Sequence, residues 1–133
     1  MITTHQARQL IAAAERHAFQ LGVPVNIAVL DAGAHLKDFT RQDGAVLGSI
    51  DIAISKARTS VLFQIPSESV WDYAKPGAPA PGLENSNGGL AVFPGGLPLF
   101  DADGALLGAV GVSGGAPSQD HEIAQAGLAA LPF

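Results

Sequence analysis

The sequence predicts an α+β fold in which helices pack on a single five-stranded antiparallel sheet. The expected elements follow one another as helix, two strands, helix, long loop, three strands and helix. Tight turns at residues 31–34 and 101–104 join strands, and strands joined in this way pair antiparallel. The chain has 133 residues, of which 47% are hydrophobic and 14% charged, and this suits one packed core. We therefore expect a single domain over residues 1–133.

Three long helices are predicted from apolar residues at helical spacing. The first begins at Thr3 or Thr4, which can cap it, and ends near residue 21 at Gly22. The second covers about residues 46–63, and Pro66 stops it. The third begins at Ser118, which can cap it, and continues to about residue 131. Residues 67–74 can add one or two helical turns.

Five strands are predicted at residues 25–30, 35–41, 90–93, 97–100 and 105–112. A loop at residues 75–89 (KPGAPAPGLENSNGG) precedes the last three strands and has no periodic pattern. A loop of this length inside a compact domain is usually functional or mobile.

Composition excludes several classes of partner. The net charge is −5 and the seven Lys and Arg residues are scattered singly, so no basic stripe exists for nucleic acid. Cysteine is absent, which excludes disulfides and thiolate metal sites. No signal-peptide pattern and no membrane-spanning run is present, and we expect a cytoplasmic protein without membrane association. The low charge predicts apolar surface buried between subunits of a homo-oligomer.

Glycine is concentrated in the second half of the chain, where residues 75–115 hold 11 of the 16 glycines. Gly108 and Gly111 lie within the last predicted strand, so something must approach its backbone closely. Gly114 and Gly115 lead into the last helix, whose free N–H groups could bind an anionic cofactor or ligand. The alternative is tight packing of a helix on the sheet, followed by a turn.

Several polar residues are candidates for catalysis or ligand binding. Arg41 and Lys56 could hold a carboxylate, with Lys56 placed off the apolar line of its helix. Glu84 could serve as a general acid or base, and the Asn87 amide could orient a ligand in the long loop. A solvated helix face and ordinary turn residues are the alternatives.

The four histidines do not form a metal-binding pattern, because no pair has the helical spacing of a zinc site. His17 follows the apolar series of the first helix, and an axial haem ligand needs an apolar wall of this kind. His17 is therefore the candidate iron ligand, with haem as the candidate cofactor. The alternative is a histidine that packs in the core or at an interface.

Several collinear motifs carry a family resemblance. They are residues 23–36 (VPVNIAVLDAGAHL), 41–45 (RQDGA), 95–99 (GGLPL) and 108–115 (GAVGVSGG). In these motifs the chain resembles the GlcG/HbpS family, which also occurs as the C-terminal domain of PduO. The resemblance implies a profilin-like or PAS-like domain that forms homo-oligomers. It also implies relatives that bind haem or are encoded in catabolic operons.

Together these observations predict a small-ligand-binding accessory protein of a catabolic pathway, with haem as one candidate ligand. The alternative is a small cofactor-independent enzyme that acts on an organic acid or a reactive carbonyl intermediate. Its site would combine Arg41, Lys56 and Glu84. A third hypothesis is an oligomeric scaffold without a ligand.

Overall fold

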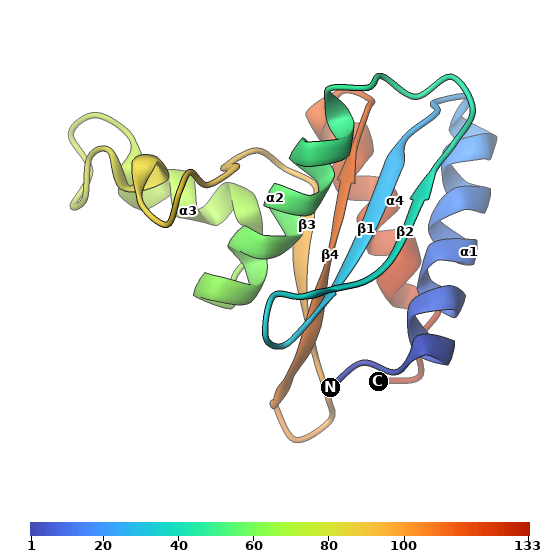
Figure 1. Cartoon of the computed structure of the whole chain (residues 1–133). Coiled ribbons are helices and arrows are strands. Elements are labelled where there is room, and N and C mark those ends of the chain that lie inside the picture. The colour runs from blue at the N-terminus through green and yellow to red at the C-terminus, as the bar shows by residue number, and fades with distance from the viewer.

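A four-stranded antiparallel sheet lies between two helical layers in the computed structural model, which describes all residues from 1 to 133 (Figure 1). The strands are β1 (Asn26–Asp31), β2 (Leu36–Arg41), β3 (Gly96–Phe100) and β4 (Leu106–Ser113), in the spatial order β2-β1-β4-β3. The antiparallel α+β fold is confirmed, and the expected fifth strand is wrong.

Residues 90–93 do not pair with the sheet, because their backbone bonds to side chains of two helices. The Ala91 N–H donates to Ser55 Oγ at 3.1 Å, and Ser67 Oγ donates to the Phe93 carbonyl oxygen at 2.5 Å. The short apolar run therefore folds as an extended segment that packs on helices.

Helices α1 (Thr4–Leu21) and α4 (Pro117–Ala129) cover one face of the sheet, and α2 (Ser49–Phe63) covers the other. Helix α3 (Ser67–Ala74) and the 3₁₀ turn η1 (Leu83–Asn85) extend sideways from the α2 layer. None of these helices combines the length and the apolar composition that crossing a bilayer requires.

The predicted start of the first helix is confirmed. Thr3 Oγ1 accepts the Gln6 N–H at 3.1 Å, and Gln6 Oε1 accepts the Thr3 N–H at 2.9 Å, which is a capping box. The predicted cap at Ser118 is wrong, because Ala116 occupies the N-cap position and Pro117 begins α4. Proline suits this first position because its missing N–H would have no helical partner there.

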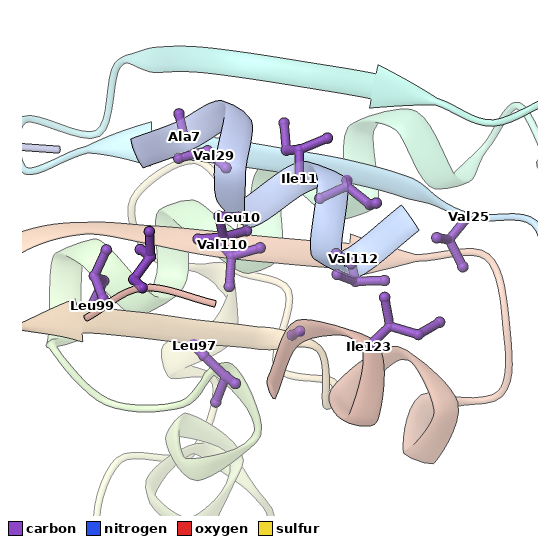
Figure 2. Packing of buried hydrophobic residues seen from close by; sticks show 14 of the residues in the cluster. Ala7, Leu10, Ile11, Val25, Val29, Leu97, Leu99, Val110, Val112 and Ile123 are labelled. Carbon is purple, nitrogen blue, oxygen red and sulfur yellow. The ribbon is translucent and has the colours of Figure 1, made fainter. Parts of the chain in front are cut away.

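The main core lies between the sheet and the α1–α4 layer. Figure 2 shows Leu10 and Ile11 of α1 above Val110 and Val112 of β4, with Ile123 of α4 beside them. A smaller cluster of four buried residues, Leu30, Ala57, Val61 and Ala109, lies between α2 and the other face.

Gly111 sets the distance between α2 and the sheet. A Cβ atom at this position would collide with the carbonyl oxygen of Ala53 and would come within 2.7 Å of the Ala57 nitrogen. Because glycine has no Cβ, the backbone of α2 lies directly on β4. This close approach brings the side chain of Lys56 to the end of β4.

Candidate functional site

A groove of about 750 Å³ lies between the C-terminal end of α1 and strand β2. Ala18, Val23 and Phe19 give it an apolar wall, and Phe19 is 82% exposed. Gln42 ties its base together, because Gln42 Oε1 accepts the Val25 N–H at 3.0 Å and Gln42 Nε2 donates to the Glu15 carbonyl oxygen at 3.3 Å. The groove is large enough for a small organic molecule.

The charged groups of the groove are Arg41, Glu15 and Asp43. Arg41, which the sequence predicts to hold a carboxylate, is exposed in this groove. The two carboxylates and the carbonyl end of α1, where Gly22 also lines the groove, weaken the attraction for an anion. Arg41 therefore contributes to a groove of mixed charge.

His17 lies outside this groove, on the side of α1 that faces α4. His17 and Phe19 are two residues apart, which is about 200° around a helix, so they point to opposite sides. His17 Nε2 lies 2.6 Å from Glu122 Oε2 of α4, and the His17 side chain is 30% exposed. The candidate iron ligand therefore carries a carboxylate partner, which the sequence did not indicate.

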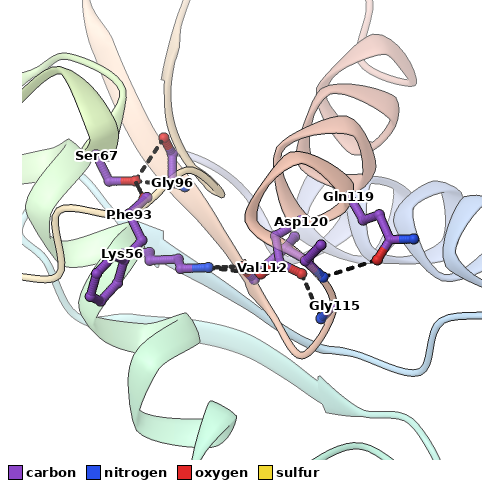
Figure 3. Close-up of polar contacts among 9 residues, drawn as sticks. Lys56, Ser67, Phe93, Gly96, Val112, Gly115, Gln119 and Asp120 are labelled. Atoms are coloured by element: carbon purple, nitrogen blue, oxygen red, sulfur yellow. Dashed lines mark hydrogen bonds and ion pairs between the residues drawn. The ribbon is translucent and has the colours of Figure 1, made fainter.

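A buried ion pair joins α2 to α4 (Figure 3). Lys56 Nζ donates to Asp120 Oδ2 at 3.0 Å and to the Val112 carbonyl oxygen at 2.8 Å. Both residues are 2% exposed. Lys56 is thus buried although it lies off the apolar line of its helix. Gly95 makes the room, because a Cβ there would come within 2.9 Å of Lys56 Nζ.

Burial dominates the protonation of this pair. It lowers the pKa of Lys56 and raises the pKa of Asp120, while the attraction between the two groups opposes both changes. The ammonium of Lys56 has two partners inside the protein and no open path to a ligand. Lys56 therefore links α2 to β4 and α4.

The Asp120 carboxylate also occupies the turn where the sequence suggests an anion site. Asp120 Oδ1 accepts the Gly115 N–H at 2.9 Å, and the Gly114 N–H also lowers the pKa of Asp120. A Cβ at Gly114 would come within 2.8 Å of the Pro24 carbonyl oxygen, and one at Gly115 within 2.7 Å of Val23 Cγ1. These contacts favour the alternative of tight packing at both glycines.

Glu84 and Asn87, the candidate residues of the long loop, lie beside α3 in the part of the chain that extends sideways from the α2 layer. Glu84 belongs to η1, and its buried Oε1 has no hydrogen-bond partner. Asn87 is exposed, with its carbonyl oxygen accepting from Arg58 Nη1 at 2.8 Å and its Nδ2 donating to Ser86 Oγ at 3.0 Å. The groove contains Arg41 but neither Lys56 nor Glu84, so the structure does not bring the three proposed catalytic residues into one hollow.

A second histidine, His121, also has an acidic partner that the sequence did not indicate. His121 Nδ1 lies 3.5 Å from Glu68 Oε1. This pair and the His17–Glu122 pair join residues far apart in the chain, so local spacing gives no signal for them. No three His, Asp or Glu side chains gather as a metal site would require.

The four-stranded antiparallel sheet between two helical layers defines a small α+β domain with a groove on its surface. The chain belongs to the HbpS-like family: residues 2–129 match the family model described as haem degrading protein HbpS-like. The family resemblance seen in the sequence is thereby confirmed.

Two relatives and one solved structure illustrate the match. The uncharacterized 15.0 kDa protein in the dhaT-dhaS intergenic region of Citrobacter freundii is 36% identical over 96% of this chain and 89% of its own length. The corrinoid adenosyltransferase PduO of Salmonella typhimurium is 37% identical over 98% of this chain, which spans 39% of that protein. The crystal structure of a PduOC:heme complex is 37% identical, with a TM-score of 0.94, and the match covers 98% of this chain and 95% of that one.

Proposed function

We propose that this chain is an accessory protein that binds haem, with His17 as the axial iron ligand. The observation that carries the proposal is the partly exposed His17 imidazole, whose Nε2 has one partner, the exposed Glu122 carboxylate on the neighbouring helix at 2.6 Å. The likeness to a haem complex over nearly the whole chain supports the same ligand.

Iron would bind at His17 Nε2 in place of Glu122, whose side chain is 54% exposed and not enclosed by other elements. A bound haem would supply an iron centre for redox chemistry or ligand binding. The groove lies on the other side of α1 and does not include His17, so His17 would hold the iron outside this groove.

Titration with haemin, followed by the Soret absorption band, tests this proposal. We expect the wild-type chain to give a saturable shift of the band, and His17→Ala to lose it. His5→Ala is the matched control, because His5 is exposed on the same helix, and it should behave as wild type. An absent shift in the wild type would remove haem as the ligand. An unchanged shift in His17→Ala would remove His17 as its ligand.

The groove favours a second candidate, the binding of a small organic acid whose carboxylate meets Arg41. Its size and its apolar wall beside a cation support this function. NMR titration with lactate and, separately, with benzoate tests it. Binding should move amide resonances around residues 18–24 and 40–43, and Arg41→Ala should abolish the change. Arg8→Ala, at an exposed position of α1 outside the groove, is the control.

A further inference from the structure

The groove between α1 and β2 contains three charged side chains that have no partner within the protein. Arg41, Glu15 and Asp43 line it, and none of the three takes part in an ion pair. The hydrogen bond that Glu15 receives from Gln42 goes to its backbone carbonyl oxygen and leaves its carboxylate free. Charges of both signs are thus available to a ligand in one hollow.

The charge of the groove does not suit a simple acid. Two carboxylates line it beside one guanidinium. Gly22 brings the carbonyl end of α1 into the groove, and the last turn of this helix has no basic residue to offset its partial negative charge. Arg16 lines a smaller neighbouring hollow but not this groove. A ligand whose only charge is a carboxylate therefore meets one attractive group and several repulsive ones.

A simple amine does not suit the groove either, because Arg41 is exposed in it and repels a second cation. A ligand that carries one carboxylate and one ammonium group matches both signs. The wall that includes Phe19, which is 82% exposed, calls for an apolar body as well. The groove volume of about 750 Å³ is sufficient for a molecule with all three features.

We propose that the ligand of this groove is a free amino acid with an apolar side chain. Its carboxylate pairs with Arg41, its ammonium pairs with the carboxylates of Glu15 and Asp43, and its side chain covers Phe19. This inference rests on the second function proposed above, an organic acid held by Arg41, and adds that the acid carries an ammonium group. It is independent of haem, because His17 lies outside the groove.

NMR titration of the full chain with four probes tests the proposal. L-phenylalanine has all three features, 3-phenylpropionate lacks the ammonium, phenethylamine lacks the carboxylate, and glycine lacks the apolar side chain. We expect L-phenylalanine to move the amide resonances of residues 18–24 and 40–43. It should bind about tenfold more tightly than each of the other three, because one hydrogen bond to a charged group, or one buried apolar side chain, contributes about that factor.

Variants without charge should affect the probes in opposite directions. The double variant Glu15→Gln, Asp43→Asn should weaken the binding of L-phenylalanine and tighten that of 3-phenylpropionate, because it removes the partners of the ammonium and the repulsion of the carboxylate. Arg41→Ala should weaken both ligands but not phenethylamine. Asp51→Asn is the matched control and should change no affinity, because Asp51 is an exposed carboxylate on α2, outside the groove.

Circular dichroism should show unchanged secondary structure in these variants, because none of the replaced groove side chains is part of an ion pair. If 3-phenylpropionate binds as tightly as L-phenylalanine and still depends on Arg41, the organic-acid function stands and the ammonium inference is overturned. An affinity for L-phenylalanine that is unchanged in the double variant overturns the inference as well. If none of the four probes moves these resonances at tens of millimolar, both the inference and the organic-acid function are wrong.

Discussion

Replacing Lys56 with methionine tests the role of the buried ion pair. The variant keeps the length of the side chain and removes its ammonium, which bonds to Asp120 Oδ2 at 3.0 Å and to the Val112 carbonyl oxygen at 2.8 Å. Asp120 is then left 2% exposed, with a carboxylate that has only glycine N–H groups as partners. Breaking a buried pair in this way typically costs about 3–5 kcal/mol.

The protonation of Asp120 gives a second, independent value for the free-energy cost of this substitution. Without Lys56, the folded protein avoids a buried unpaired charge by binding a proton at Asp120, whose ordinary pKa is 3.8. At pH 7 this protonation costs about 4 kcal/mol, since each pKa unit corresponds to ~1.36 kcal/mol. That value agrees with the range for broken buried pairs, and it is a large part of a total stability of about 5–15 kcal/mol.

The sign of the pH dependence follows. Burial raises the pKa of Asp120, and Lys56→Met removes the attraction that opposed this rise. The folded variant therefore keeps its proton to higher pH than the unfolded chain does. The stability contributed by Asp120 is fully present below pH 3.8 and is lost as the pH rises through the folded pKa. At pH 4 the protonation cost falls below about 1 kcal/mol.

Urea unfolding at pH 7 and pH 4, followed by circular dichroism at one protein concentration, measures both effects. Arg58→Met is the control, because Arg58 lies two residues further along α2 and bonds only to the exposed loop. It should cost less than about 1 kcal/mol. A loss below 1 kcal/mol for Lys56→Met at pH 7, or a loss that is equal or larger at pH 4, would refute the reasoning.

Two further predictions concern the approach of α2 to the sheet and the histidine pair. Gly111→Ala should lower the free energy of unfolding by about 3 kcal/mol, because the added Cβ meets the backbone of α2. The control is Gly48→Ala, whose added Cβ has no atom within 4 Å. It should change the free energy of unfolding by less than about 1 kcal/mol. Equal effects of the two changes in urea unfolding would contradict this account. Glu122→Gln should tighten haemin binding up to about fivefold, because a neutral side chain competes less with iron for His17 Nε2. The fivefold limit corresponds to the ~1 kcal/mol that an exposed ion pair contributes at most. Weaker binding in the Soret titration would show that Glu122 supports the ligand instead.

The helices and four of the strands could be predicted from the sequence because their signals are local. The 3.6-residue period, the cap at Thr3 and the stop at Gly22 lie within the elements that they define. The segment 90–93 gave a false strand, because a short apolar run does not distinguish a strand from an extended segment covered by helices. Ser55 and Ser67, which bond to that segment, are distant from it in the chain.

The site residues were harder to predict, because their partners come from other elements. Lys56 looks exposed from its own helix, and its burial depends on Gly95 and Asp120, which the chain supplies 39 and 64 residues later. Arg41 does line a groove, but beside Glu15 and Asp43, and not beside Lys56 and Glu84, with which it was combined. The pairing of His17 with Glu122 spans 105 residues and has no local pattern.

The glycine-rich strand β4 connects the two layers of the protein. Gly111 lets α2 lie on the sheet, and the resulting position of Lys56 lets its ammonium reach Asp120 in the first turn of α4. Glu122 follows Asp120 by two residues and points to the opposite side of α4, toward His17. The buried pair therefore holds the part of α4 that presents the carboxylate to the proposed iron ligand. The absence of a side chain at Gly111, on one face of β4, thus helps to position Glu122 beside His17 on the other face.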